Sequence, residues 1–270
     1  MGPRMQSWCN PMKRAHFLLA AAALAVPAHA DGPAAQGTLS VAAAANLVYA
    51  LDALDAQFAK ADPGVTVTGA TGASGSLVAQ IEHGAPYDVF LSADADFPRA
   101  LVKAGQADAA SLSAFAVGRL VLWTTEAGVD VSDVAAAVRS PAVKRLAIAN
   151  TTTAPFGRAA KEALQKLGAW DDVQPKLVVG ENISQAAQFV DTGNADAGFV
   201  ALSIVISPKL RDKGRWTEVP AGLHGPLEQC AVITAHGASN PAAARYIAFL
   251  RSPEAQAILK TFGYGIPAAP

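Results

Sequence analysis

The stretch KLVVGENISQAAQFVDTGNADAGFVALS, residues 176–203, decides the predicted fold of this chain. Its first apolar residues indicate a buried strand that ends at Gly180, and the apolar spacing from Ser184 onward is that of a helix. Gly193 is expected to end this helix, and the run Ala197–Leu202 predicts a second strand directly after it. Strand, turn, helix and strand in this order form the repeating unit of an α/β protein.

The same layout recurs three times elsewhere, at Ser40–Ala59, Val65–Gly84 and Leu146–Gly168. The first turn of a helix has backbone N–H groups without an acceptor inside the helix, and the helix dipole makes this end attractive to anions. Each unit carries such a helix start directly after a strand. We therefore expect several strand-to-helix turns to face one cleft.

Two α/β series follow one another along the chain. The first has the order βαβαβ, which predicts a parallel sheet with helices on both faces, and the second begins at Arg119. The last strand, Leu227–Ala235, and the last helix, Pro241–Phe262, have no series of their own, so we expect them to pack on the first lobe. The predicted fold class is α/β, with two doubly wound lobes around a ligand cleft. The expected division is 36–118 for the first part of lobe 1, 119–222 for lobe 2 and 223–270 for the return segment of lobe 1.

The first thirty residues have the pattern of an export signal. Lys13 and Arg14 precede the apolar run Phe17–Val26, and small residues at Ala28 and Ala30 fit the positions that an export peptidase reads. We expect residues 1–30 to be a signal peptide that is cleaved after Ala30, which places the mature protein in the periplasm. An uncleaved membrane anchor is the alternative, and the run is short for that role.

Charge and cysteine content narrow the classes of partner. Removing Arg4, Lys13 and Arg14 with the signal leaves 18 basic residues against 22 acidic ones, and the basic residues do not cluster. This balance argues against a nucleic acid as partner. Cys9 leaves with the signal, so Cys230 has no intrachain disulfide partner and is expected to be a small buried residue of a strand.

Four of the strand-to-helix turns carry candidate binding groups. Asn46 and Ser74 stand where helix N-caps are expected, and simple capping explains both residues without any ligand. Pro155 is suited to the first helical turn, which leaves the N–H of Phe156 as a free donor. The equivalent donors of the 176–203 unit lie near Ile183. Capping and anion binding are compatible, because the cap and the free N–H groups face the same way.

Essentially the whole chain after the signal resembles the periplasmic molybdate-binding proteins that supply a membrane ABC importer, and the resemblance is densest in four segments. The segments are SVAAAANL (40–47), GASGSLVAQIEHGAPYDVFLSAD (72–94), IANTTTAPFG (148–157) and GENISQAAQFVDTGNADAGFVAL (180–202). The resemblance implies a type II periplasmic binding protein fold, with an oxyanion held between the lobes by neutral donors. It also implies a solute-binding protein and not an enzyme, with molybdate or tungstate as transported ligand, no cofactor, an importer permease as partner, and a monomeric state.

Carried over by position, the resemblance implies that the ligand contacts come from the backbone of Ala45, from Asn46 and Ser74, and from the N–H groups of Phe156 and Ile183. These groups would contact the oxygens of molybdate and would not be direct ligands of the metal. Some family members have Ser in place of Asn46, and some have a Tyr contact where this chain has Ala201, so that contact is missing here.

No basic residue falls at any of these turns, so the predicted site relies on neutral hydrogen-bond donors. Hydrogen bonds to a charged partner contribute about 1.5–3 kcal/mol each. If the site offers donors and no acceptors, a fully deprotonated oxyanion is preferred over a protonated phosphate, whose O–H would have no acceptor.

Other functions explain single features of the sequence. A secreted hydrolase would use Ser74 as nucleophile, but its turn signature needs Gly where Ser76 stands. The possible bases, His83, His224 and His236, are expected at the surface.

Binding proteins of the same fold for sulfate, another oxyanion or a small organic acid also remain open. An organic acid calls for an arginine at the cleft, and Arg158 is the nearest one along the chain. A metal site is disfavoured, because Asp88 and Asp94 are expected to be strand and cap residues and no His, Cys, Asp or Glu set has ligand spacing.

Overall fold

The computed structural model describes residues 37–267, which lie within one compact unit, Ala35–Pro270. The signal peptide expected at residues 1–30, with Cys9, lies outside the described residues. Across residues 37–267, no helix has both the length and the apolar character that a membrane crossing requires.

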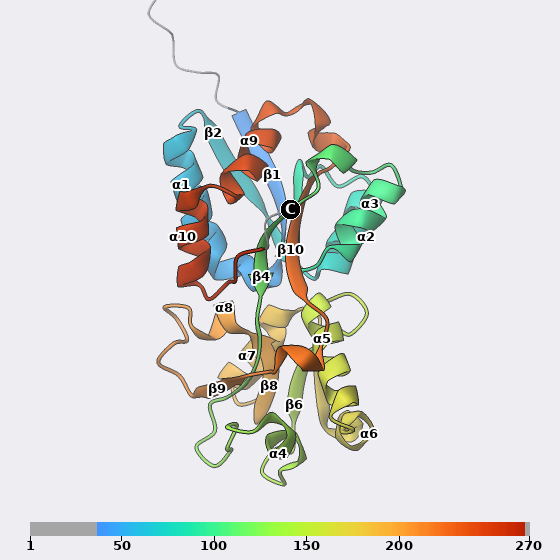
Figure 1. The fold of residues 1–270 in the computed structure, drawn as a ribbon, viewed down its shortest axis with the longest axis vertical. Helices are drawn as coiled ribbons and strands as arrows, with labels where there is room; N and C mark the ends of the chain where they lie inside the picture. Colours follow the sequence, from blue (N-terminus) through green and yellow to red (C-terminus); the bar gives the residue numbers. More distant parts are fainter. Residues whose placement is uncertain (1–36, 268–270) are drawn as a thin grey trace, which may run out of the picture. The chain divides into compact units, whose positions relative to one another are not determined.

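The first lobe is built on a five-stranded sheet with the strand order β2-β1-β3-β10-β4 (Figure 1). β1 pairs in parallel with β2 and β3, whereas β10 runs antiparallel to β3 and β4. The strands are β1 (Gly37–Ala44), β2 (Val65–Gly72), β3 (Val89–Ser92), β4 (Ser113–Gly118) and β10 (Leu227–Ile233). The helices are α1 (Val48–Ala61), α2 (Ser74–Glu82), α3 (Asp96–Lys103), α9 (Pro241–Leu250) and α10 (Pro253–Thr261).

The second lobe has its own five-stranded sheet, in the order β7-β6-β8-β5-β9. β6 is parallel to β7 and β8, and β5 is antiparallel to β8 and β9. Its strands are β5 (Leu120–Thr124), β6 (Leu146–Ala149), β7 (Leu177–Gly180), β8 (Ala197–Ala201) and β9 (Arg215–Glu218). Its helices are α4 (Val134–Arg139), α5 (Pro155–Lys166), α6 (Trp170–Val173), α7 (Ile183–Asp191) and α8 (Leu202–Val205). Five short 3₁₀ helices occur along residues 37–267, in both lobes: η1 (Ala45–Leu47), η2 (Ala109–Ser111), η3 (Gln174–Lys176), η4 (Ala221–Leu223) and η5 (His236–Ser239).

The predicted fold class, two α/β lobes, is confirmed, and so is the unit on which it rested. The stretch 176–203 forms β7, α7 and β8, with the helix ending just before Gly193, whose φ of 71° is one that glycine adopts without strain. The parallel pairing expected for the first βαβαβ series is confirmed for β1, β2 and β3. The chain leaves the first lobe through β4 and returns through β10, so these neighbouring strands run in opposite directions.

The expected single helix over Pro241–Phe262 is wrong, because the structure has two helices there. Pro253 has no N–H for the helical hydrogen bond, and Ser252 caps the second helix by accepting from the N–H of Ala255 at 3.2 Å. The short strands β4 and β9 were not predicted.

The chain passes between the lobes at two places, from β4 to β5 and from β9 to β10 (Figure 1). An ion pair joins the two connections on the side of the second lobe, where Arg119 Nε donates to Glu218 Oε1 at 2.7 Å. This hydrogen bond lowers the pKa of Glu218. The start of β5 and the end of β9 are thus held together beside the crossing.

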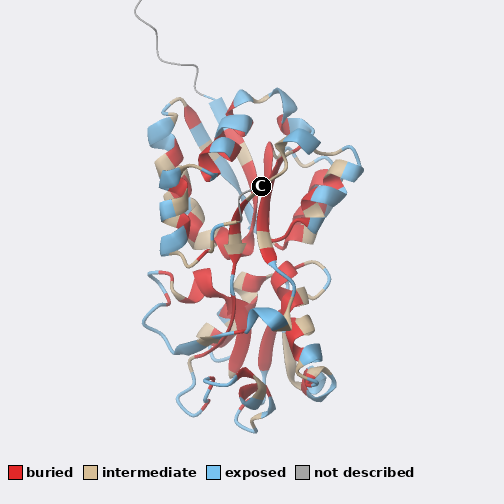
Figure 2. Cartoon of the chain, viewed as in Figure 1, coloured by how far each residue is buried: buried red, intermediate tan, exposed pale blue. Residues whose placement is uncertain are grey.

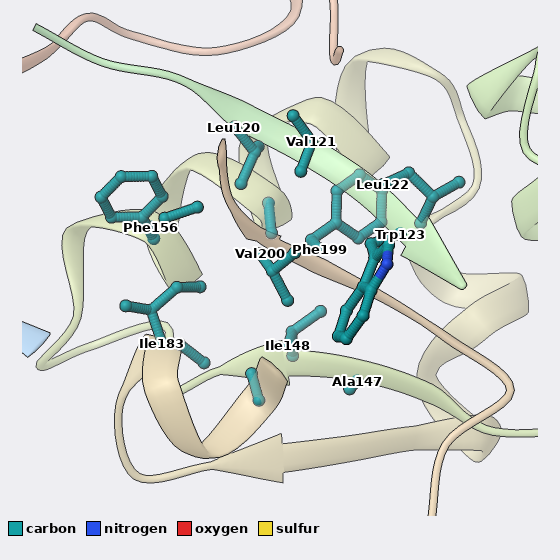
Figure 3. Packing of buried hydrophobic residues seen from close by; sticks show 14 of the residues in the cluster. Leu120, Val121, Leu122, Trp123, Ala147, Ile148, Phe156, Ile183, Phe199 and Val200 are labelled. Atoms are coloured by element: carbon teal, nitrogen blue, oxygen red, sulfur yellow. The ribbon is translucent and has the colours of Figure 1, made fainter. Parts of the chain in front are cut away.

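Buried residues lie along the strands of both sheets and on the inner faces of the helices (Figure 2). In the second lobe, Trp123 and Phe199 are fully buried, and the indole N–H of Trp123 donates to the carbonyl of Lys213 at 3.0 Å. Figure 3 shows that Phe156 and Ile183 belong to this same cluster. Their side chains anchor the starts of α5 and α7 in the core, which fixes the positions of their backbone N–H groups.

Cys230 lies in β10 and is buried, as predicted. Burial raises the pKa of its thiol to about 12, so almost none of it is thiolate at neutral pH. We expect the mature protein to react very slowly with a thiol reagent such as DTNB at pH 8, and rapidly once it is unfolded in guanidinium chloride. Equal labelling rates in the native and unfolded states would show that this residue is accessible.

Candidate functional site

All five residues that the sequence marked as binding residues line one small cavity. The cavity lies where β1, β2, β3, α5 and α7 begin or end, and none of its lining residues is charged. The lining residues are Ala44, Ala45, Asn46, Gly72, Ala73, Ser74, Ala93, Ala154, Pro155, Phe156, Asn182 and Ile183. Both lobes therefore contribute to the cavity.

Ser74 is not the N-cap that the sequence suggested. The N-cap of α2 is Ala73, and Ser74 is the first helical residue, without a side-chain cap hydrogen bond. Its hydroxyl oxygen accepts from the N–H of Ala93 at 3.1 Å, and the residue is 1% exposed. Among residues 37–267 the structure gives no acceptor for the Ser74 hydroxyl hydrogen, so this hydrogen can be donated to a ligand.

Asn46 is also not an N-cap. It lies within η1, and its side-chain amide donates to Gln229 Oε1 at 2.8 Å and to the hydroxyl of Tyr264 at 2.9 Å. Gln229 Nε2 donates in turn to the carbonyls of Ala93 and Leu227, which fixes Gln229 Oε1 as an acceptor and Asn46 Nδ2 as the donor. The side chain of Asn46 is thereby held in one orientation.

The backbone of Asn46 is held as well. Its carbonyl accepts from the hydroxyls of Ser203 at 2.8 Å and Tyr264 at 2.9 Å. Burial raises the pKa of Tyr264, which keeps this hydroxyl protonated as a donor. The N–H of Asn46 has no acceptor among the described residues and is the donor that this residue still offers.

The side-chain oxygen of Asn46 is an acceptor that the sequence analysis did not consider. Asn46 Oδ1 is buried and has no donor among residues 37–267. One acceptor atom therefore belongs to a cavity-lining residue.

The starts of α5 and α7 present the backbone donors that the sequence predicted. In α5, Pro155 occupies the first turn and Ala154 gives no side-chain cap. In α7, Asn182 caps the N–H groups of Ser184 and Gln185 at 3.0 and 3.1 Å. The structure gives no acceptor within residues 37–267 for the N–H groups of Ser74, Phe156 and Ile183. Three helix starts thus bring free N–H groups to one cavity.

Direct hydrogen bonds join the two lobes beside the cavity. The N–H of Gly75 donates to the carbonyl of Thr153 at 2.8 Å, and Ser184 Oγ donates to the carbonyl of Ala45 at 2.8 Å. Gly75 is needed at this contact, because a Cβ there would lie 2.9 Å from the ring of Phe97 and 3.0 Å from Thr153 Cα.

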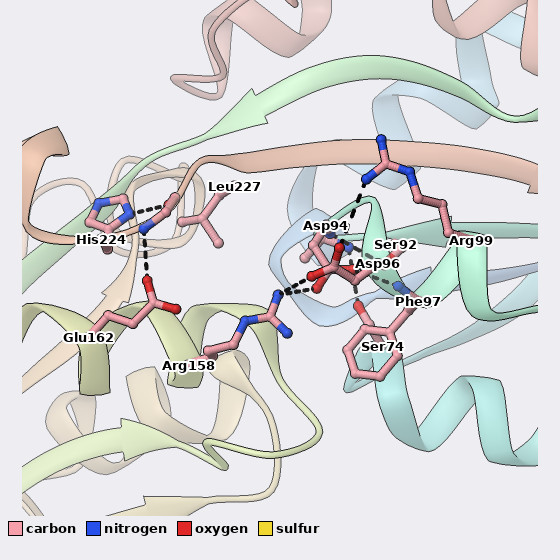
Figure 4. Close-up of polar contacts among 12 residues, drawn as sticks. Ser74, Ser92, Asp94, Asp96, Phe97, Arg99, Arg158, Glu162, His224 and Leu227 are labelled. Atoms are coloured by element: carbon pink, nitrogen blue, oxygen red, sulfur yellow. Dashed lines mark hydrogen bonds and ion pairs between the residues drawn. The ribbon is translucent and has the colours of Figure 1, made fainter.

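The charged and titratable candidates of the sequence lie elsewhere. Arg158 does not line the cavity, and its guanidinium is 2.5 Å from Asp94 Oδ2 (Figure 4). His83, His224 and His236 contact Ala79, Gly225 and Asp88 respectively, and none contacts Ser74. Asp94 accepts from the N–H of Phe97 in the first turn of α3, although the N-cap of this helix is Ala95 and not Asp94 as expected.

The residues that hold Asn46 in place were missed by the sequence analysis. Gln229 carries a signal that could have identified it, because it is a polar residue between Leu227 and Ala231 on the inward face of a predicted strand. Ser203 and Tyr264 follow no motif that predicts this contact.

Comparisons with known proteins agree on one class. Residues 39–265 match the family model described as bacterial extracellular solute-binding protein. The molybdate-binding protein ModA of Azotobacter vinelandii is 43% identical over 228 residues, which cover 84% of this chain and 90% of that protein. The molybdate-binding protein ModA of Rhodobacter capsulatus is 43% identical over 232 residues, covering 86% and 90%. The solved structure of an A. vinelandii periplasmic molybdate-binding protein matches with a TM-score of 0.80 at 36% identity, covering 85% of this chain and 100% of that one.

Proposed function

This chain belongs to the bacterial extracellular solute-binding proteins and, within them, to the molybdate-binding proteins, and we propose that it captures molybdate for delivery to an ABC importer. The observation that carries this proposal is the convergence of unused N–H groups on one uncharged cavity. Such a set of donors suits a small anion that is bound by geometry instead of by an opposite charge. The protein is accordingly a transport protein and not an enzyme, and its ligand is a cargo and not a cofactor.

We assign the ligand contacts to the backbone at Ala45 and Asn46, to Ser74, and to the N–H groups of Phe156 and Ile183. They contact the oxygens of molybdate and not the molybdenum. Besides the contact at the Ala45 backbone, the N–H groups of Asn46, Ser74, Phe156 and Ile183 and the hydroxyl of Ser74 make five donors. Five hydrogen bonds to a charged partner contribute roughly 8–15 kcal/mol before the costs of association. A Kd of about 1 μM corresponds to a net free energy of about −8 kcal/mol, so the upper part of this range leaves room for the costs of association.

The proposal has three further parts: a second ligand, the bounds of the two lobes and the location of the mature protein. Tungstate has the same charge and tetrahedral shape as molybdate and is the second expected ligand. The lobe bounds 36–118, 119–222 and 223–270 are supported by the division of the strands between the two sheets. Cleavage after Ala30 would release a monomeric mature protein into the periplasm, where it meets the importer permease.

Calorimetric titration of the mature protein with molybdate, tungstate, sulfate and phosphate, one at a time, tests the function. We expect molybdate and tungstate to bind with a Kd of about 1 μM or below, and sulfate and phosphate to bind more weakly. Strong binding of sulfate without binding of molybdate would assign the protein to another oxyanion.

Replacing Ser74 by alanine removes one hydroxyl donor and leaves the N–H of α2 in place. We expect this variant to bind molybdate about tenfold or more weakly, which corresponds to about 1.4 kcal/mol. Ser76→Ala is the matched control, because Ser76 lies on the same helix and does not line the cavity. Equal affinities of the two variants, measured by the same titration, would remove the Ser74 hydroxyl from the site.

A further inference from the structure

Arg158 forms ion pairs between the two lobes, and within residues 37–267 no other basic residue does so. It lies in the first turns of α5, in the second lobe. Its Nη2 atom is 2.5 Å from Asp94 Oδ2 and 3.4 Å from Asp96 Oδ2, both in the first lobe just after β3. Figure 4 shows the guanidinium reaching across to these two carboxylates.

Asp94 is a buried carboxylate that lines a neighbouring pocket, which shares Pro155 with the cavity. Only 3% of the residue is exposed, and its neighbour Ala93 lines the cavity and donates its N–H to Ser74 Oγ. Ser92 Oγ donates to Asp94 Oδ1 at 3.2 Å, as does the N–H of Phe97 at 3.2 Å. The carboxylate is thus fixed in place, and it belongs to the residue that follows cavity-lining Ala93 in the chain.

A fixed negative charge beside an anion site repels the ligand unless it is compensated. Water screens buried charges poorly, so the repulsion from Asp94 would extend into the cavity. Arg158 supplies the compensating charge, and it comes from the opposite lobe. The charge of Asp94 is therefore compensated only while the two lobes are in contact. In this structure they are in contact, for example through the hydrogen bond from the Gly75 N–H to the Thr153 carbonyl.

We propose, building on the function proposed above, that Arg158 retains the oxyanion by neutralising Asp94. When the lobes separate, Arg158 moves away from Asp94, and the exposed carboxylate then favours release of the dianion. Arg158 acts through Asp94 and has no contact with the ligand, because it does not line the cavity. It is a positioning residue whose charge sets the residence time of molybdate.

The test is the rate of molybdate release, measured by stopped-flow competition on the full mature protein. We expect Arg158→Gln to release molybdate roughly tenfold faster or more. Arg158→Lys keeps the charge and is expected to stay closer to the wild type. Arg99→Gln is the matched control, because Arg99 lies 3.9 Å from Asp96 and both side chains are exposed. Its release rate should stay within about twofold of the wild type.

The double variant distinguishes two roles of the ion pair, which are neutralising the charge of Asp94 and holding the two lobes together. If Arg158 acts by neutralising Asp94, then Asp94→Asn in the Arg158→Gln background restores slow release, and Asp94→Asn alone does not accelerate it. If the ion pair only holds the two lobes together, both single variants accelerate molybdate release equally. The double variant then releases molybdate as fast as they do, which overturns the proposal. Should Arg158→Gln fail to fold, Asp94→Asn alone still decides, since faster release from it contradicts charge compensation.

A wild-type protein that binds no molybdate overturns the proposed function as well, whereas unchanged release from Arg158→Gln overturns only the role of Arg158.

Discussion

Replacing Ile183 by proline is expected to weaken molybdate binding by about tenfold to a hundredfold while leaving α7 intact. Ile183 is the first residue of α7, the position at which proline is best tolerated in a helix, and α5 already begins with Pro155. Asn182, the preceding residue, has φ −143° and ψ 177°, an extended conformation that is compatible with a following proline. The substitution therefore deletes one backbone N–H that has no other acceptor in the described structure.

The loss of the buried isoleucine side chain needs its own control, because Ile183 packs in the core of the second lobe. Ile183→Val shortens the side chain and keeps the N–H, so it should bind molybdate nearly as well as the wild type. Calorimetric titration and thermal unfolding of both variants separate the two effects. Equal affinity of the proline and valine variants would mean that this N–H does not contact the ligand.

Gly75→Val is expected to weaken molybdate binding by roughly a hundredfold or more, about 2.7 kcal/mol, although Gly75 does not line the cavity. A Cβ at this position would lie 3.0 Å from the backbone of Thr153 in the opposite lobe, and backbone atoms cannot move aside as a side chain can. The branched side chain should therefore hold the lobes apart at the rim of the cavity. Donors from only one lobe would then reach the anion.

Small-angle scattering measures this effect directly. The Gly75→Val variant should show no compaction when molybdate is added, whereas the wild type is expected to compact. Gly128→Val is the control, because a Cβ at this exposed loop position meets nothing within 4 Å. Tight binding by Gly75→Val would show that the contact between Gly75 and Thr153 is not needed for closure.

The local parts of the fold could be predicted because their signals are local. Apolar periodicity and a glycine stop defined β7, α7 and β8, and Pro155 marked the start of α5 to within one residue. The break between α9 and α10 had a visible signal in Ser252 and Pro253, whose capping serine and missing N–H outweigh the continuous apolar spacing.

The parts of the site that could not be predicted depend on contacts between distant segments. The side chain of Asn46 is held by residues 183 and 218 positions away, and Ser74 is displaced from its expected capping position to one where it accepts from Ala93. A helix-cap motif is recognised from residue types a few positions apart, so it cannot predict hydrogen-bond partners that are distant in the sequence. The resemblance to a family supplied the candidate residues, and the fold supplied their hydrogen-bond partners.

The position of β10 also bears on the order in which the chain folds. β10 comes from residues 227–233 and lies between β3 and β4. The first sheet therefore remains incomplete until these late residues of the polypeptide are available. All strands of the second sheet come from the continuous stretch 120–218, whose pairings need no later residues. It follows that the second sheet can assemble while the first is still incomplete. In a polypeptide with this topology, the first sheet is completed only when the C-terminal segment is available.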